Sequence, residues 1–331
     1  MRNKFTGLVA VAAAAVMVLA GCSSGGTGGG SSSGGGSDKP FKVIAFTSGN
    51  QTPIGAWWVK AVNAKAKELG WDLTMIQGDF DFQKMNPAVE SAIGQGADVI
   101  FDGYTDVASI GSIITAAKDA DIPIFAMDSA TQTEDAFALN ITSNQQGIAD
   151  GTVGALDKAL GGLKGKTIMV IGHDPHPGIR LRASLAEKEL KAAGAIIAGG
   201  EIQKVKSPAT GRTEALAIVT DYLTAHPDGL DGVWVGWDDA ALGASKAVTE
   251  AGSKARVTGS DATSEAIAEI EAGGAFLATD AQPWPEILGT VVDAITAYQK
   301  DGTLPKKSYE AVDTTIVDSS NAAKITPSDK L

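Results

Sequence analysis

The 331-residue sequence contains one cysteine, Cys22, and only three histidines. A lone thiol cannot form an intrachain disulfide, so the fold must be stabilised by burial. No apolar run after residue 22 is long enough to span a bilayer. Basic residues number 27 against 39 acidic ones, a net charge of −12, and no basic cluster stands out. These features argue against a nucleic-acid-binding surface.

The sequence also lacks complete catalytic motifs. Outside the Gly/Ser-rich N-terminal tract there is no Gly-x-Ser-x-Gly elbow, and no complete phosphate loop is present. Gly161–Gly165 is glycine-rich but precedes a predicted strand, which favours a connecting turn. His173-Asp-Pro-His176 follows a predicted strand and fits a plain loop, a ligand hydrogen bond or, with further ligands, a metal. We therefore predict a protein that is not an enzyme and has no cofactor and no metal.

The N-terminus has the pattern of an export signal. Arg2 and Lys4 precede thirteen apolar residues at 8–20, and residues 23–37 are only Gly and Ser apart from Thr27. Leu19-Ala-Gly-Cys22 resembles the lipobox of bacterial lipoproteins, which implies cleavage before Cys22 and lipidation of its thiol. We predict a signal peptide at 1–21 and a lipidated, flexible tether at 22–40. The alternative is an ordinary signal peptide with an incidental thiol.

Beyond the tether, short apolar strands alternate with amphipathic helices, which predicts parallel sheets covered on both faces. The 310 residues left after removal of 21 exceed what one hydrophobic core usually organises. We therefore expect two doubly wound α/β lobes; a closed (β/α) barrel is the rival architecture. The predicted strands are 41–47, 71–76, 98–101, 122–127, 167–171, 196–202, 232–235, 257–260, 276–279 and 314–317, and the predicted helices are 56–69, 87–93, 110–120, 147–160, 180–193, 214–225, 240–251, 264–272 and 286–300.

Ligands of open parallel sheets collect at the carboxyl ends of the strands, and polar side chains follow several predicted strands. Asp128 and Asp261 can accept hydrogen bonds from hydroxyl groups, and Arg182 is a charged donor. Asn50, Gln51 and Gln282 offer both donors and acceptors. This mixture suits a polyhydroxylated ligand, because each hydroxyl both donates and accepts.

Aromatic residues make up only 6% of the chain, yet six are Trp. Trp237 follows a predicted strand, so it is a candidate for covering the C–H face of a ligand or, equally, for packing. Trp58, Trp71 and Trp234 are better explained as packing residues. Asp238 is a candidate helix cap, and Thr263 is another.

Several stretches together resemble type 1 periplasmic substrate-binding proteins of bacterial sugar ABC transporters, the ribose-binding-protein-like group, over about residues 41–318. They include Gln95–Ile100, Ala120–Asp128, Leu223–Asp228, the Trp237-Asp-Asp-Ala-Ala-Leu-Gly-Ala244 segment and Gly259-Ser-Asp261. The resemblance implies two lobes joined by a three-stranded hinge, one formed by 41–142 plus 283–312 and the other by 143–282 plus 313–331.

The resemblance also implies residue roles. Asp128, Arg182, Asp261 and Gln282 would be polar ligand contacts. Trp237 stands where ribose-type proteins usually have Asn, and Ser129 where they usually have Arg. Ile54-Gly55 replaces the usual aromatic pair, and Trp57-Trp58 is displaced toward the helix. The predicted ligand-binding set is Asn50, Gln51, Trp57, Asp128, Ser129, His176, Arg182, Trp237, Asp261 and Gln282.

The resemblance further implies the function. We expect a lipid-anchored, extracytoplasmic solute-binding component of an ABC importer. It would be a monomer that captures a carbohydrate or polyol between its lobes and delivers it to the permease subunits, touching the membrane only through Cys22. The alternative is a sensory receptor that presents its ligand to a chemoreceptor or kinase. A transcription regulator would need a DNA-binding helix-turn-helix before residue 41, where the signal and tether stand instead.

Overall fold

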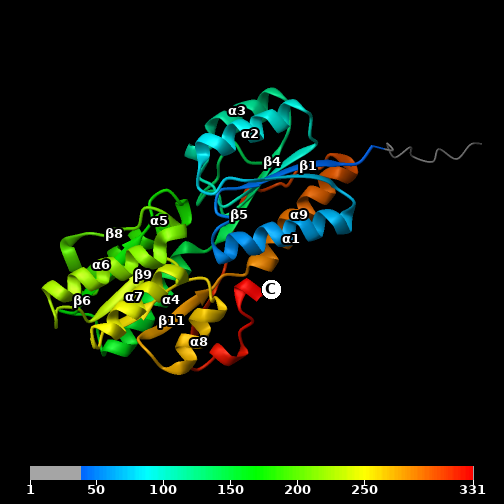
Figure 1. Cartoon of the computed structure of the whole chain (residues 1–331). Coiled ribbons are helices and arrows are strands. Elements are labelled where there is room, and N and C mark those ends of the chain that lie inside the picture. The colour runs from blue at the N-terminus through cyan, green and yellow to red at the C-terminus, as the bar shows by residue number, and fades with distance from the viewer. Residues whose placement is uncertain (1–38, 331) are drawn as a thin grey trace, which may run out of the picture. The chain divides into compact units, whose positions relative to one another are not determined.

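The computed structural model describes residues 39–330. These residues form two open sheets in two lobes, each sheet with helices on both faces (Figure 1). The predicted two-lobed α/β class is therefore confirmed, and the barrel alternative is wrong. The predicted signal peptide, lipidated Cys22 and nearly all of the tether lie outside the described residues. Within 39–330, no helix combines the length and apolarity needed to cross a membrane.

The first sheet is entirely parallel, in the order β12-β5-β4-β3-β1-β2. Helices α1 and α9 pack on one face, and α2 and α3 on the other. The strands are β1 Lys42–Thr47, β2 Asp72–Gln77, β3 Val99–Gly103, β4 Ile124–Met127, β5 Leu139–Ser143 and β12 Tyr309–Val312, and the helices are α1 Pro53–Leu69, α2 Phe82–Gly94, α3 Gly111–Asp119 and α9 Trp284–Asp301.

The second sheet has the order β13-β11-β10-β9-β6-β7, with β8 also paired to β6. Only β13 runs antiparallel, against β11. Helices α4 and α5 cover one face, and α6, α7 and α8 the other. The strands are β6 Thr167–Gly172, β7 Ile196–Ile197, β8 Gln203–Lys204, β9 Gly232–Val235, β10 Arg256–Thr258, β11 Phe276–Ala281 and β13 Thr315–Asp318, and the helices are α4 Gln145–Leu160, α5 Pro177–Ala192, α6 Gly211–Ala225, α7 Asp238–Glu250 and α8 Ser264–Ala272.

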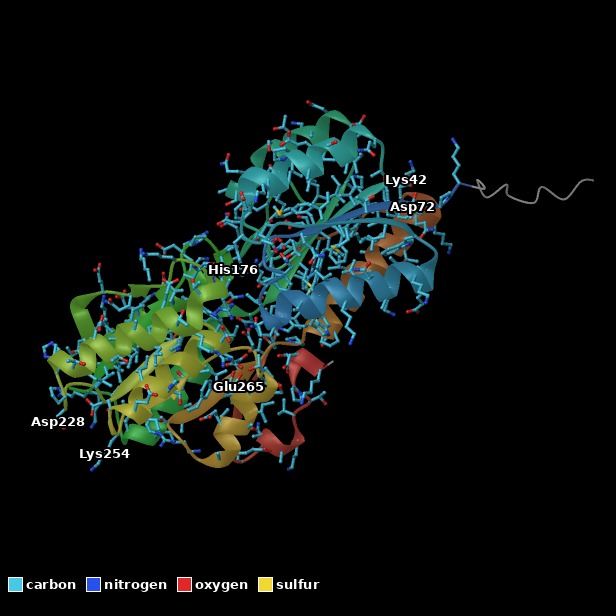
Figure 2. All side chains as sticks on the ribbon, in the orientation of Figure 1. Lys42, Asp72, His176, Asp228, Lys254 and Glu265 are labelled. Atoms are coloured by element: carbon cyan, nitrogen blue, oxygen red, sulfur yellow. The ribbon has the colours of Figure 1, made fainter. Side chains whose placement is uncertain are left out.

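The chain passes between the two sheets three times, after β5, after β11 and after β12. The carboxyl ends of the strands in both lobes face the region between them. Figure 2 illustrates this: His176 and Glu265, which follow strands, lie on the side of the second lobe nearer the first. Asp228 and Lys254, which precede strands, lie at its far end. Loops that follow strands of both lobes can therefore build one site.

Local sequence explains several helix boundaries. Thr52 accepts a hydrogen bond from the backbone N–H of Gly55, and Pro53 occupies the first turn, so α1 begins there. Gly70 ends α1 with a left-handed φ of 70°, as predicted from its glycine. Thr263 caps α8 by accepting from Ala266 N–H, again as predicted.

Some predicted boundaries are wrong, because a side-chain cap sets the start of one helix and glycines interrupt one strand. Helix α2 begins at Phe82 rather than residue 87 because Asp81 accepts two backbone N–H groups. The strand predicted at 196–202 is broken by a turn in which Gly199 and Gly200 have left-handed φ. Strands β5 and β12 were not predicted. Asp238 does not cap α7; its carboxylate instead accepts from Thr263 and Thr279.

Close packing of α6 on α7 depends on Gly243. A Cβ at this position would lie 2.0 Å from the backbone oxygen of Arg212, which cannot move without shifting α6. We predict that Gly243→Ala lowers the free energy of unfolding by about 1–3 kcal/mol, measured by chemical denaturation. The control is Gly154→Ala at an exposed position of α4, where a Cβ meets nothing within 4 Å and helix propensity favours alanine. Equal stability of the two variants would contradict the packing argument.

Candidate ligand-binding site

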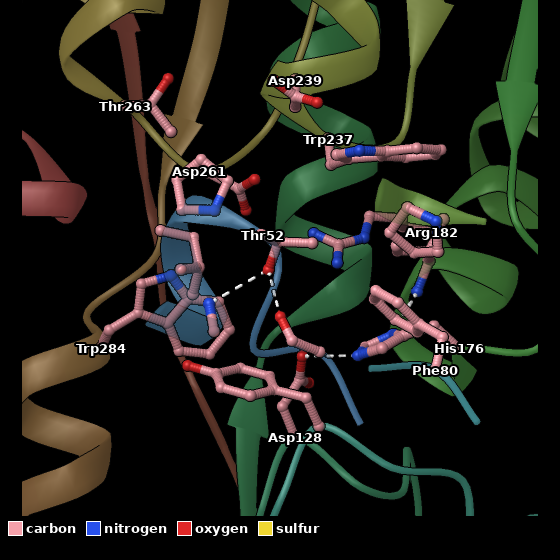
Figure 3. A pocket seen from close by; sticks show the side chains of 17 residues that line it. Thr52, Phe80, Asp128, His176, Arg182, Trp237, Asp239, Asp261, Thr263 and Trp284 are labelled. Carbon is pink, nitrogen blue, oxygen red and sulfur yellow. Dashed lines mark hydrogen bonds and ion pairs between the residues drawn. The ribbon is translucent and has the colours of Figure 1, made fainter. Parts of the chain in front are cut away.

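A pocket lies between the two lobes, with about 650 Å³ of empty space that includes a part open to solvent. Loops that follow β1, β2, β3 and β4 and the start of α9 form the wall of the first lobe. Loops that follow β6, β9 and β10, together with α5, form the opposite wall (Figure 3). The lining side chains include Thr52, Phe80, Tyr104, Asp128 and Trp284 from the first lobe, and His176, Arg182, Trp237, Asp239 and Asp261 from the second.

Unusual backbone geometry is concentrated at this pocket. Seven non-glycine residues in the described chain have positive φ, and four of them line it: Phe80, Tyr104, Asp128 and Asp261. Such conformations are unfavourable for L-residues and persist only where the surrounding structure enforces them. Each residue directly follows a strand or lies within a few residues of its end, where the backbone turns sharply to bring the side chain to the pocket.

Asp128 is buried at the end of β4. Its backbone N–H donates to Ile141 at 2.8 Å, and its Oδ1 accepts from the Thr142 hydroxyl. Burial raises the pKa of Asp128 from 3.8 to about 6, against the lowering effects of Arg182 and of the Thr142 hydrogen bond. At neutral pH the group is therefore an ionised acceptor inside the pocket.

His176 caps α5 and faces Asp128. Its Nδ1 accepts from the N–H of Ile179 at 3.3 Å, which leaves the proton of the neutral ring on Nε2. Nε2 lies 3.4 Å from Oδ2 of Asp128. Burial, assisted by Arg182, holds the pKa of His176 well below 6.5. The imidazole is therefore a neutral donor directed at Asp128 rather than a cationic partner.

Arg182 is the buried cation of the site. Its side chain extends from α5 toward the middle of the pocket (Figure 3), and the residue is only 2% exposed. Nε and Nη1 have no hydrogen-bond acceptor among the described residues. Arg182 also lowers the pKa of Asp128, Asp261 and Asp280, although burial outweighs it at each. Because leaving a charged donor unsatisfied in a buried place is costly, acceptor atoms of a ligand would stabilise it.

Asp261 lies across the pocket from the first lobe. Its Oδ1 accepts from Nε2 of Gln282 at 2.7 Å. Burial and then the neighbouring Asp238 carboxylate raise the pKa of Asp261 well above its usual value, while Arg182 opposes them. The raised pKa favours the protonated form, which can donate as well as accept a hydrogen bond.

Indole and phenol groups supply flat apolar surface with polar edges. Trp237 lines the second-lobe wall, and its ring lies against α6 where Gly211 leaves space; a Cβ there would be 2.5 Å from the ring. Trp284 lines the first-lobe wall and stacks edge-on against Tyr104, with ring centroids 5.5 Å apart. Nε1 of both tryptophans and the Tyr104 hydroxyl have no partner among the described residues.

Two arginines beside the pocket, Arg180 and Arg212, form ion pairs. Arg180 of α5 bonds Asp106, which follows β3, at 3.0 Å, so this pair joins the second lobe to the first. Arg212 binds Asp239 at 2.8 Å and both oxygens of Glu265 at 2.7 and 2.8 Å. The carboxylate of Asp239, which lines the pocket, is thus already paired.

Five of the ten predicted ligand residues line the pocket: Asp128, His176, Arg182, Trp237 and Asp261. The other five lie behind or beside it. Asn50 bonds Asp79, Gln51 is exposed, and Trp57 packs in the hydrophobic cluster under α1. Ser129 is buried and donates to the Met127 carbonyl, and Gln282 contacts the pocket through Asp261.

The predicted ligand-binding set leaves out several pocket residues, namely Thr52, Phe80, Tyr104, Asp239 and Trp284. Tyr104, Asp239 and Trp284 follow strands closely, so the rule that selected Asp128 also points to the stretches that contain them. Phe80 follows β2 by three residues, in a turn that carries no sequence signal for left-handed backbone.

Among residues 39–330 no cluster of three or more acidic or histidine side chains is placed to hold a metal, and His173 bonds the Val205 carbonyl.

Two open α/β lobes with a polar and aromatic pocket between their strand ends define a two-lobed solute-binding protein. Residues 44–303 match the periplasmic binding protein domain, so the chain belongs to that family, whose members are binding proteins rather than enzymes.

Individual relatives agree with this placement. The chain is 28% identical to the D-apiose import binding protein of Paraburkholderia graminis, over 86% of this chain and 89% of the relative. It is 26% identical to the ribose import binding protein of Bacillus subtilis, over 76% and 79%. A crystal structure of an ABC transporter solute-binding protein from Agrobacterium vitis with bound allitol shares the fold, with a TM-score of 0.78 and 21% identity, covering 86% of this chain and 98% of that one.

The buried carboxyl groups predict an unusual pH dependence of stability. Burial raises the pKa to about 7 for Asp102 and to about 6 for Asp128, Asp238 and Asp280, from 3.8. Between 3.8 and these values the folded state binds protons that the unfolded state has released. The free energy of unfolding should therefore fall as pH rises through this window, by about 1.4 kcal/mol per pKa unit of each shift.

We expect the ligand-free protein to melt at a higher temperature at pH 5 than at pH 8, as measured by calorimetry. Asp102→Asn should reduce the difference, because it removes one of the shifted groups. Asp157→Asn on the exposed surface of α4 is the matched control and should leave it unchanged. His173 and His176, whose pKa values are lowered by burial, act in the opposite sense, so a higher melting temperature at pH 8 would contradict the dominance of the carboxyl groups.

Proposed function

We propose that this chain is a lipid-anchored, extracytoplasmic solute-binding component of an ABC importer. It captures a neutral carbohydrate or polyol between its lobes and delivers it to the permease subunits. The observation that carries the proposal is the buried guanidinium of Arg182, whose Nε and Nη1 lack acceptors among the described residues. A hydroxyl-rich ligand supplies such acceptors.

The charges of the pocket favour a neutral ligand. Arg182 is balanced by ionised Asp128, and burial keeps His176 neutral. Asp239 is paired with Arg212, and the raised pKa of Asp261 favours its uncharged form. A strongly charged ligand would leave one of these groups without a counterpart, whereas hydroxyl groups can bond donors and acceptors alike.

The aromatic surfaces and the relatives support the same ligand class. Trp237 and Trp284 offer flat apolar faces from opposite lobes, which suits the C–H faces of a sugar ring or polyol chain. Relatives are named for import of D-apiose and ribose, and a structural neighbour holds allitol. Because the pocket takes groups from both lobes, a bound ligand favours a state in which they are held together. The Arg180–Asp106 pair would add to this state.

Removing a pocket acceptor should remove binding without unfolding the protein. We predict that Asp128→Ala weakens binding of the best ligand in a sugar and polyol panel by about 100-fold or more, because Arg182 and the ligand hydroxyls both lose a charged partner. Isothermal titration calorimetry measures this. Asp157→Ala on the surface of α4 is the control. An unchanged affinity of Asp128→Ala would show that the site is elsewhere.

The location rests on the N-terminal sequence. Cleavage before Cys22 and lipidation of its thiol would anchor a monomeric chain to the membrane, with residues 22–40 as a tether. The folded part would divide into a lobe of 41–142 plus 283–312 and a lobe of 143–282 plus 313–331. The family name indicates an extracytoplasmic location, which agrees with an export signal.

The lipid anchor has a direct test. We expect Cys22→Ser to prevent lipidation, so that the protein is lost from the membrane fraction and no longer incorporates labelled fatty acid. Ser24→Ala, in the tether, changes a side chain of similar size nearby and serves as the control. Membrane association and labelling of Cys22→Ser equal to the wild type would rule out the anchor.

A further inference from the structure

Phe80 is an aromatic residue that the hydrophobic cores do not use. Every other Phe in residues 39–330 belongs to a buried hydrophobic cluster or packs against one. Phe80 belongs to none of these clusters and instead lines the pocket while remaining partly exposed. The hydrophobic clusters therefore do not account for a large apolar side chain in this place.

The backbone that holds Phe80 is strained. Asp79 and Phe80 have consecutive left-handed φ values of 50° and 59°. Neither is glycine, so this conformation must be maintained by contacts around the turn. The N–H of Phe80 donates to the Ser48 carbonyl at 2.8 Å, and the N–H of Gly78 donates to Thr47 at 2.9 Å. These two hydrogen bonds hold the turn after β2 against the end of β1 and the loop that follows it.

Asn50 supplies the side-chain part of this connection. Its Nδ2 donates to Oδ1 of Asp79 at 2.6 Å, and its Oδ1 accepts from the backbone N–H of Asp79 at 3.0 Å. On the other side of Phe80, Asp81 is fixed because it caps α2. Both neighbours of Phe80 are therefore held in place, which directs the ring to the pocket.

We propose that Phe80 is a specificity-determining residue that covers the C–H face of the ligand, and that Asn50 is a positioning residue that acts through Phe80. The inference rests on the proposed function, since an apolar wall beside the polar Arg182 and Asp128 suits a ligand with both hydroxyl groups and C–H faces. Trp237 provides the aromatic surface of the opposite lobe, so the two residues enclose the ligand from both walls (Figure 3).

The first test compares variants on whichever compound binds the wild-type chain. Phe80→Ala should weaken binding about tenfold or more, as truncation of a buried aromatic contact does. Phe80→Tyr should retain most of the affinity because the ring remains. Gln83→Ala, an exposed position on the first turn of α2, is the control. Equal affinities of Phe80→Ala and the wild type would overturn the role of Phe80 without affecting the proposed function.

The second test separates positioning from direct contact by a double-mutant cycle. Asn50→Ala should weaken binding in the wild type but cause no further loss when Phe80 is already Ala. If the two losses add, Asn50 contacts the ligand itself and the positioning role is wrong.

The positioning role also has a test that needs no ligand. Asn50→Ala should speed amide hydrogen exchange at Phe80 and Asp81, whereas Gln83→Ala should not. Unchanged exchange in Asn50→Ala would contradict the positioning role. Failure of every sugar and polyol to bind the wild type would count instead against the proposed ligand class, so the two failures are distinguishable.

Discussion

The buried guanidinium of Arg182 is the constraint on which the pocket depends. It is nearly inaccessible to solvent, and two of its nitrogens lack acceptors among the described residues. The charge of Arg182 lowers the pKa of three carboxyl groups, those of Asp128, Asp261 and Asp280. Burial raises the pKa of each by more. The pocket therefore contains one permanent cation and acids that are only weakly stabilised as anions. The described residues do not supply hydrogen-bond acceptors for all of the guanidinium donors. A hydroxylated ligand completes these hydrogen bonds, because it can donate to the acids and accept from the guanidinium.

Topology explains why these groups meet. Parallel strands of both lobes end toward the same space, so residues far apart in sequence face one another there. The backbone turns sharply just beyond these ends, and left-handed residues such as Tyr104, Asp128 and Asp261 mark the turns. Strain at these positions is maintained by the surrounding hydrogen bonds, for example the one from Asp128 to Ile141. Hydrogen bonds of this kind restrict the backbone within each wall, which reduces the conformational entropy that ordering the wall costs on binding.

The sequence predicts the fold better than it predicts the site. Alternating apolar strands and amphipathic helices suffice for two doubly wound lobes, because periodicity reports which faces are buried. Strand-end position directed attention to Asp128 and Arg182, and both line the pocket. Strand-end position could not reveal the hydrogen bonds between the Asn50 side chain and Asp79. These bonds join the loops after β1 and β2, and the sequence does not indicate the left-handed backbone at Phe80 on which the contact depends. Phe80 was overlooked for the same reason.

The most direct test of the binding site is a crystal structure of this chain with the sugar or polyol that binds it best. We expect ligand oxygens within hydrogen-bonding distance of Nε or Nη1 of Arg182 and of the Asp128 carboxylate, with the C–H face of the ligand against Trp237. A ligand bound outside this pocket, or one inside it that leaves both of these Arg182 nitrogens without an acceptor, would contradict the central role of the guanidinium.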